Sequence, residues 1–228
     1  MSRKALSKYK YKKIASESFR NSLRLHKDSM LLYAHDSFPS SFQLSVLSLE
    51  EFAKAKWVDR VLGIISTNHG FPKEGTLKYD DHVQFEQKWL KLLYQHPEKQ
   101  FAFIGQEIFD YKPDFVSKVK EKRLEHQKQQ AVYVGLDRSK GKIETESQIS
   151  IPSKKIQQKH AKEMIALINY EFLEIYNLIR KNGGYWFDWK MDEVIAEEQY
   201  DIIFKWPHKT DIKSKRWIKK NHAKSKNN

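Results

Sequence analysis

The stretch 38–65, FPSSFQLSVLSLEEFAKAKWVDRVLGII, constrains the fold of this chain more than any other part of the sequence. Ser37 can cap a helix here, Pro39 fits a first helical turn, and no further Pro or Gly interrupts the pattern before Gly63. We therefore expect one long helix. Helical spacing gives it two apolar stripes, whereas a surface helix usually has one. The stripes consist of Phe42, Val46, Leu49, Ala53 and Trp57, and of Leu44, Leu47, Val58 and Leu62.

Charged residues lie close to these apolar stripes. Glu50 and Lys54 share a narrow polar strip with Gln43, and Glu51 falls inside the second stripe. We expect both carboxylates and the ammonium group to face packed neighbours. One interpretation is structural, since a pair of Glu50 and Lys54 at (i, i+4) stabilises an exposed helix by only ~0.2–0.5 kcal/mol. The other is functional, because charges beside apolar surface are costly unless they are paired or used. The solvated face is expected to consist of Ser45, Ser48, Lys56 and Asp59.

The net charge of +13 is concentrated at the two ends of the chain. Residues 1–13 carry six Lys or Arg and no acid, and residues 205–228 carry nine Lys or Arg against Asp211, so the remainder is nearly neutral. Tyr and Trp side chains interleave with these charges. This pattern suits a polyanion such as RNA, although solvated tails that aid solubility have the same composition. The predicted nucleic-acid-binding residues are Lys213, Lys215, Arg216, Trp217, Lys219 and Lys220.

Composition also limits where the chain works. The sequence has no Cys, so it can form neither disulfides nor Cys-ligated zinc sites and needs no oxidising compartment. It contains no apolar run of membrane-spanning length, and residues 1–13 lack the apolar segment of a signal peptide. We expect a cytoplasmic protein without a membrane partner. The His residues lack metal-ligand spacing and there is no phosphate-binding Gly-rich loop, so we expect no metal and no cofactor.

Further helices are expected on both sides of the central one. The chain is predicted to form an all-α bundle over 14–204, with basic extensions at 1–13 and 205–228. A small inserted β-hairpin is expected at about 131–149, because AVYVGL is rich in β-formers and turn residues follow it. The other predicted helices span 14–36, 77–95, 100–110, 114–130 and 153–182, with a short helix before 204.

The run SFQLSVLSLEEFAKA resembles the second helix of the AbiV family of abortive-infection proteins, a branch of the HEPN superfamily. In that helix a small and apolar stretch leads into Glu-Glu-x-x-Lys-Ala, and residues 19–55 carry most of the resemblance. Tyr133 and Val134 match a later Tyr-Val-Asp strand of the family, but Gly135 stands where the Asp is expected. The resemblance implies a HEPN-like helical bundle.

An AbiV-type cluster is the first candidate site that the resemblance implies. Asn21 and His82 fall where the family tends to have an Asn on the first helix and a His on the third. In this site Glu50 or Glu51 and His82 would act as general base and acid on RNA. Lys54 would stabilise the charge of the phosphate.

An Arg–His pair is the alternative site. Many HEPN proteins are metal-independent ribonucleases in which an Arg holds phosphate and a His five to seven positions further on moves a proton. Arg20 and His26 match this spacing, with Asn21 directly after the Arg. Arg216 and His222 match it as well, although chance alone predicts about one such match in a chain of this composition.

The resemblance implies an abortive-infection antiphage effector that acts on RNA or the translation machinery. Whether it is a HEPN-type endoribonuclease stays open, because the alternative is a non-catalytic helical interaction module that binds a phage or host protein and RNA. The expected partners are RNA or the ribosome and a phage-encoded activator protein. A homodimer is also expected, since 153–182 together with Trp186, Phe187 and Trp189 would leave an apolar patch on a lone bundle.

Overall fold

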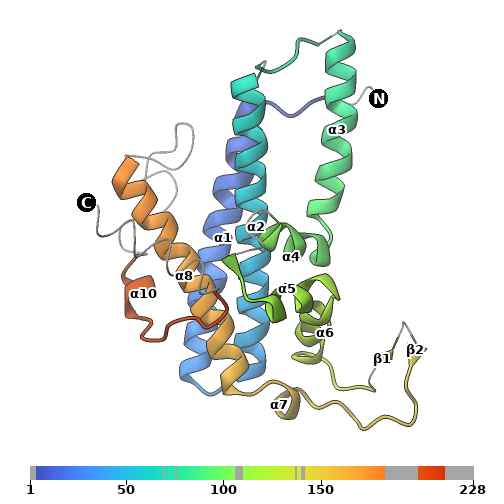
Figure 1. Cartoon of the computed structure of the whole chain (residues 1–228), viewed down its shortest axis with the longest axis vertical. Coiled ribbons are helices and arrows are strands. Elements are labelled where there is room, and N and C mark those ends of the chain that lie inside the picture. Colours follow the sequence, from blue (N-terminus) through green and yellow to red (C-terminus); the bar gives the residue numbers. More distant parts are fainter. Residues whose placement is uncertain are drawn as a thin grey trace.

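The computed structural model describes residues 4–68, 70–74, 76–105, 110–136, 138–139, 142–182 and 200–213 (Figure 1). The described chain is mostly helical, which confirms the predicted fold class at that level. Its elements are α1 (Lys8–Ala34), α2 (Phe38–Asn68), α3 (Leu77–Leu93), α4 (His96–Ile104), α5 (Pro113–Lys120), α6 (Arg123–Gln130), β1 (Arg138–Ser139), β2 (Lys142–Ile143), α7 (Pro152–Lys155), α8 (Gln158–Asn182) and α10 (Tyr200–Lys205).

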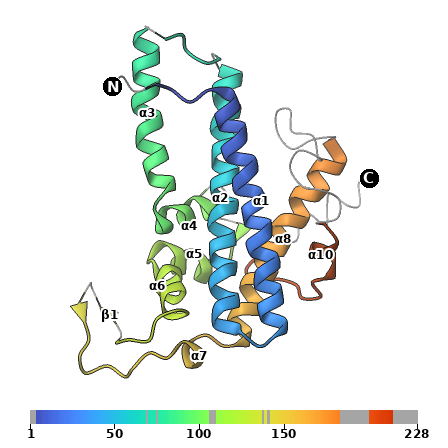
Figure 2. The same ribbon diagram turned by 180° about the vertical axis from the view of Figure 1, so that it is seen from behind.

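The long helices α1 and α2 form an antiparallel hairpin that the other helices surround (Figures 1 and 2). α1 begins after Ser7, whose hydroxyl accepts a hydrogen bond from the backbone N–H of Lys10 at 3.3 Å. A tight turn follows α1, and Asp36 adopts a φ of 58° there, a conformation that Asp tolerates better than most residues. α2 then starts at Phe38, where the sequence predicts it.

Small serine side chains line the contact between α1 and α2. The hydroxyl groups of Ser22 and Ser48 each donate to the other residue's backbone carbonyl oxygen, at 2.7 and 2.8 Å. The Ser41 hydroxyl donates to the carbonyl oxygen of Ser29 at 2.8 Å. Because these side chains are small and their hydroxyls donate to backbone carbonyls across the contact, the two helices can approach closely without leaving these buried hydroxyls unpaired.

This contact corrects one prediction from the sequence. Ser45 and Ser48 are fully buried and Asp59 is 3% exposed, whereas the sequence places them on a solvated face. Lys56, assigned to the same face, is half-buried. The prediction was wrong because hydropathy treats serine as a polar surface residue, although its hydroxyl can bond to a carbonyl of its own or a neighbouring helix.

One side of the α1–α2 hairpin is covered by α8, which crosses it at an angle (Figure 1). Three fully buried rings meet here, Phe19 of α1, Phe52 of α2 and Phe172 of α8, with centroids 5.3–5.7 Å apart. These separations are typical of favourable aromatic pairs. The amide nitrogen of Asn169 donates to the carbonyl oxygen of Ile203 at 2.9 Å, which attaches α10 to α8.

The helices α3 to α6 lie on the opposite side of the hairpin (Figures 1 and 2). α3 starts at Leu77 as predicted, but the next helix begins at His96 instead of residue 100. Pro97 occupies the first turn of α4, a position that Pro tolerates, and does not simply terminate the preceding helix. The single helix predicted over 114–130 is divided into α5 and α6 at Lys122, whose φ is 59°.

The β-hairpin predicted over 131–149 does not extend over all of those residues. Ala131 and Val132 continue the last turn of α6 through hydrogen bonds to Gln127 and Gln129, so the predicted first strand does not begin there. Among the described residues of this segment, two pair on each side, β1 with β2, and an isolated bridge joins Gly135 to Ser150. Figure 1 shows this segment extending away from the helices, so it lacks a layer against which longer strands could pack.

The two basic ends contribute to the body of the protein where they are described. α1 begins at Lys8, earlier than the predicted residue 14, and Tyr11 is fully buried. The 212–213 segment meets the residues before α5, since the Lys112 N–H donates to the Ile212 carbonyl oxygen at 2.7 Å. The predicted patch residues Trp186, Phe187 and Trp189 lie outside the described residues. None of the described helices has the length and apolarity needed to cross a membrane.

Candidate functional site

Eight polar side chains from three helices converge midway along α2, on the side covered by α4 and α6. α2 contributes two adjacent carboxylates and a lysine, α4 adds an imidazole, a lysine and an amide, and α6 adds a carboxylate and a lysine. We call this group the Glu50 cluster, and its members are Glu50, Glu51, Lys54, His96, Lys99, Gln100, Glu125 and Lys128.

The buried carboxylate of Glu50 is the centre of this cluster. Its Oε1 accepts from Gln100 Nε2 and from Lys128 Nζ, both at 2.8 Å. Its Oε2 lies 2.5 Å from His96 Nδ1 and 3.7 Å from Lys99 Nζ. Glu50 is completely shielded from solvent, so these four partners replace the water that an ionised carboxylate would otherwise bind.

Two further carboxylates alternate with the lysines. Glu51 lies 3.3 Å from Lys99 Nζ and 3.7 Å from Lys54 Nζ. Glu125 Oε2 accepts from Lys128 Nζ and from Gln100 Nε2, both at 2.8 Å. Within the cluster three carboxylates therefore balance three ammonium groups. His96 is the remaining ionisable member, and its protonation would change the net charge of the cluster from zero to +1.

Within the cluster, Glu50 is shielded from solvent and His96 is accessible to it. The side chains of Glu51 and Lys54 are 17% and 18% exposed, and that of His96 is 50% exposed. A carboxylate that holds one imidazole nitrogen fixes the tautomer and the orientation of the ring, which leaves the other nitrogen for proton transfer. The arrangement thus combines an oriented acid–base group with lysines that can attract an anion.

The sequence analysis missed the contributions of α4 and α6. The only signs of these contributions in the sequence are local spacings. His96, Lys99 and Gln100 stand at i, i+3 and i+4 and so share one face of a helix. Glu125 and Lys128 stand at i and i+3 in the same way. Recognising that Pro97 can begin a helix would have placed His96 on this face.

His82, predicted to act with Glu50 or Glu51, belongs to a different group of side chains. Its Nε2 lies 3.0 Å from Glu86 Oε1 on the same helix, without the alignment of a hydrogen bond. The Glu86 carboxylate also accepts from the Tyr11 hydroxyl and, at 2.9 Å, from the backbone N–H of Leu6. These contacts attach the N-terminal segment to α3, and none of them involves the Glu50 cluster.

The structure also separates the residues assigned to α1. Asn21 accepts two hydrogen bonds from the guanidinium group of Arg24, at 3.0 and 3.3 Å, on the surface of the helix. Arg20 is exposed and pairs with Glu17 at 2.9 Å. Neither contact links these side chains to the Glu50 cluster.

His26 is wholly buried. Its Nε2 lies 3.0 Å from Asn169 Oδ1, and its ring packs on Phe172. Burial lowers the pKa of this imidazole to about 4, and the hydrogen bond to Asn169 only partly opposes that shift. A neutral, enclosed imidazole has no access to the phosphate that the exposed Arg20 could hold. The second Arg–His match, Arg216 and His222, lies outside the described residues.

Lys213 is buried and paired within the fold, although the sequence predicts that it contacts RNA. It is 5% exposed, its Nζ lies 2.5 Å from Glu171 Oε1, and it stands 4.2 Å from the ring centroid of Tyr111. Burial is the largest single influence on Glu171 and acts to raise its pKa, but the charges of Lys213 and Lys56 and the hydrogen bonds from Lys213 and Tyr111 together outweigh it, so the pKa is lowered. The other predicted contacts, Lys215, Arg216, Trp217, Lys219 and Lys220, lie outside the described residues.

The comparison with protein families bears on the whole of this site. The model of the HEPN_AbiV family, described as AbiV, matches residues 10–170. The chain belongs to the HEPN_AbiV family. The match contains every member of the Glu50 cluster, whereas Lys213 lies beyond it. Membership in HEPN_AbiV makes this a HEPN-type, abortive-infection protein. No curated protein and no solved structure matches the chain.

The carboxylates of this HEPN_AbiV chain are arranged for ion pairing. Across the described residues, no three His, Asp or Glu side chains are grouped as metal ligands would be. Glu50, Glu51 and Glu125 instead each have at least one ammonium group within 2.8 to 3.7 Å. Their negative charge is already compensated by the chain itself.

Proposed function

We propose that this HEPN_AbiV protein is an antiphage effector that acts on RNA or the translation machinery as a metal-independent ribonuclease, with the Glu50 cluster as its catalytic centre. The proposal rests on the position of His96. It is half-exposed, is held by the buried carboxylate of Glu50, and shares its opening with Glu51 and Lys54. A solely structural ion-pair network gives no reason to present an oriented imidazole to solvent.

The residues at this opening can be given the roles of an RNA-cleaving site. Glu51 accepts the proton of a ribose 2′-hydroxyl as its oxygen attacks the adjacent phosphorus. The bond from phosphorus to the 5′ oxygen breaks, and protonated His96 donates a proton to that leaving oxygen. Lys54 and Lys99 stabilise the negative charge on the phosphate oxygens. The products are a 2′,3′-cyclic phosphate and a 5′-hydroxyl end.

Expression in a bacterium with and without phage, followed by sizing of total RNA, tests the proposal. The variants Glu51→Gln, Lys54→Met and His96→Gln should abolish protection and the new RNA fragments, while the melting temperature changes modestly. Loss of a general acid or base lowers such a rate by about 10²–10⁴-fold. His35→Gln, at an exposed position outside the cluster, is the matched control and should protect fully. Full protection by a Glu51→Gln, Lys54→Met double variant would overturn the catalytic role.

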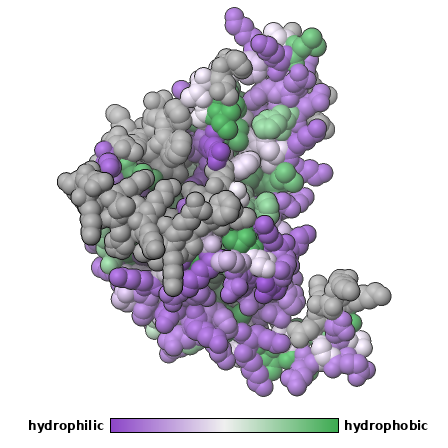
Figure 3. Space-filling model, in the orientation of Figure 1, coloured by the Kyte–Doolittle hydropathy of each residue, from purple (hydrophilic) through white to green (hydrophobic). Residues whose placement is uncertain are grey.

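An apolar groove favours a second candidate function, a non-catalytic interaction module. The groove has a volume of about 610 Å³ and lies between α2, α3 and α4. Its lining includes Trp57, Ile64, Phe85, Leu92 and Phe101, and the last four are each about half-exposed. The coloured part of the face in Figure 3 is largely hydrophilic, with separate hydrophobic patches. Such a groove suits a phage or host protein as partner.

The two functions give different results in the same experiment. An effector that only binds a protein partner should arrest growth with intact RNA, and Phe85→Ser should remove protection while His96→Gln keeps it. A ribonuclease should show the opposite dependence on His96. We also propose that the chain acts as a homodimer, since a second copy would extend the surface available to RNA.

A further inference from the structure

A pocket of mixed polar and apolar lining lies between α6 and the segment that follows it. Its volume is about 280 Å³, just below the ~300–1,000 Å³ of sites for drug-sized ligands, so it suits one small planar group. We call it the α6 pocket. The residues that give it its chemistry are His126, Gln129, Gln130, Tyr133, Ile143 and Ser150.

The lining of the α6 pocket has the features that recognise a nucleobase. Beyond its bond to Glu125, the side-chain amide of Gln129 keeps one N–H and its oxygen, a donor and an acceptor that can read the edge of a base, and His126 adds an imidazole ring. Tyr133 is 68% exposed, so the face of its ring is accessible for stacking. Ile143 provides an apolar surface on the same pocket.

Ser150 is an independent sign that the pocket takes a ligand. This residue is 4% exposed and lines the pocket, yet its hydroxyl has no hydrogen-bond partner among the described residues. Its backbone is fixed by two hydrogen bonds with Gly135, which hold this residue at the wall of the pocket. A buried hydroxyl without a partner is unfavourable, and a polar ligand atom would satisfy it.

The α6 pocket is directly connected to the Glu50 cluster. Gln129 Nε2 donates to Glu125 Oε1 at 3.2 Å, and the other oxygen of Glu125 accepts from Lys128 Nζ at 2.8 Å. Lys128 in turn holds Glu50. One short helix therefore presents the cluster on one face and the pocket on the next. An RNA strand that follows α6 would therefore pass both sites.

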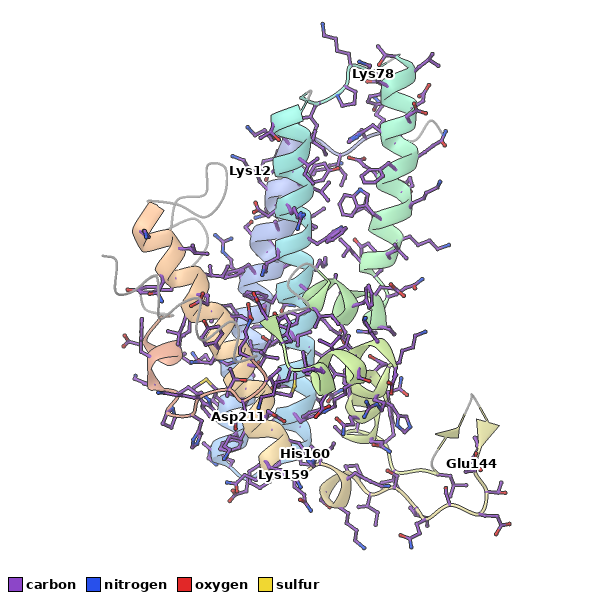
Figure 4. The ribbon with its side chains drawn as sticks, viewed as in Figure 1. Lys12, Lys78, Glu144, Lys159, His160 and Asp211 are labelled. Atoms are coloured by element: carbon purple, nitrogen blue, oxygen red, sulfur yellow. The ribbon has the colours of Figure 1, made fainter. Side chains whose placement is uncertain are left out.

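We propose that the α6 pocket binds one base of single-stranded RNA and so positions the adjoining phosphate at the Glu50 cluster. The inference rests on the proposed action on RNA and adds a site that selects unpaired substrate. A duplex would keep the edges and faces of its bases occupied, so it could not enter. A peptide fits less well, because β1 and β2 are two residues long and offer little edge for strand addition. Glu144, labelled in Figure 4 just beyond β2, lies at the outer end of the segment and does not line the pocket.

Binding of labelled oligoribonucleotides to the full chain, measured by fluorescence anisotropy, tests the proposal. Wild-type protein should prefer single-stranded over duplex RNA of equal length. Tyr133→Ala should lose at least about fivefold in affinity for the single strand, the lower limit for one stacked base, whereas Tyr133→Phe keeps the ring and should bind normally. Phe204→Ala is the matched control, since it removes another half-exposed ring, on α10 and away from the pocket, and should leave affinity unchanged.

A second measurement locates the base. A single strand that contains 4-thiouridine should crosslink to Tyr133 or to a neighbouring pocket residue in wild-type protein. Equal affinity of wild type and Tyr133→Ala, or crosslinks only elsewhere, would overturn the α6 pocket while the proposed ribonuclease could still stand on the Glu51 and His96 variants. If Tyr133→Ala loses phage protection with RNA binding intact, the pocket contacts a protein and the proposal is wrong. Failure of wild type to bind any single strand would also overturn it.

Discussion

The substitution Asp59→Asn is expected to stabilise the protein, and the gain should grow as pH rises. Asp59 lies on the face of α2 that carries Ser41 and Ser48 and packs on α1. It is 3% exposed, and its Oδ1 has no hydrogen-bond partner among the described residues. Burial without a countercharge raises the pKa of this carboxyl from 3.8 to about 7. Near neutral pH the fold therefore holds a carboxyl group that resists ionisation.

The magnitude follows from the two pKa values of Asp59. The native state binds the proton more tightly than the unfolded state, so its stability falls as pH rises from about 4 to about 7 and then levels off. A gap of about three pKa units corresponds to ~4 kcal/mol at alkaline pH. About 2–3 kcal/mol of this develops between pH 5 and pH 8. Asn carries no charge in either state, so its variant lacks this loss.

The buried imidazole of His26 acts in the opposite direction. Its native pKa of about 4 lies below the unfolded value of 6.5, so this group makes the protein more stable as pH rises between those values. In wild-type protein the two effects partly cancel below pH 6.5. The difference between wild type and Asp59→Asn removes the His26 contribution, because both proteins contain it.

Urea unfolding of both proteins at pH 5 and pH 8 measures that difference. The free energy of unfolding should favour Asp59→Asn by about 2–3 kcal/mol more at pH 8 than at pH 5. Asp81→Asn, at an exposed position on α3, should change little at either pH. An equal effect of Asp59→Asn at both pH values, or a larger one at pH 5, would refute the assignment of a raised pKa to this residue.

Two further predictions concern the basic end and the assembly. Ending the chain after Lys213 removes six Lys or Arg but keeps the buried pair with Glu171, so RNA affinity should fall and its salt dependence should flatten. An unchanged salt dependence would assign residues 214–228 to solubility. Light scattering at micromolar concentration should give the mass of two chains. A monomeric mass over a wide concentration range would contradict the proposed homodimer.

Much of the helical framework could be predicted from the sequence. The starts of α2 at Phe38 and of α3 at Leu77 agree with the capping and apolar signals, because these signals act within a few residues. The same rules gave wrong predictions where contacts with the rest of the fold determine the local structure. A Pro in the sequence can end one helix or begin another, and Pro97 begins α4. The β-forming residues Val132, Tyr133 and Val134 form no strand because no layer covers them.

The candidate site was predictable only in the part that one helix supplies. Glu50, Glu51 and Lys54 adjoin the apolar stripes of α2, and the spacing within that helix identifies them. The partners of Glu50 are far away in sequence, His96 by 46 positions and Lys128 by 78. Periodicity describes which residues share a face, but it cannot say which face of another helix will pack there. His82 has the right residue type on the adjacent helix, yet it contacts Glu86 instead.

In the proposed site the two adjacent glutamates have different roles. Removing the Glu50 charge would leave the buried Lys128 without its central partner, and breaking such a pair typically costs ~3–5 kcal/mol, so loss of function there reports folding as well as chemistry. Glu51 is partly exposed, and its lysine partners stand farther away, at 3.3 and 3.7 Å. In the proposed reaction Glu51 therefore meets the substrate, while Glu50 keeps the helices and the His96 ring in place. The proposed site needs both an accessible and a buried carboxylate, and neighbouring positions on one helix supply them because α4 and α6 cover the first carboxylate more fully than the second.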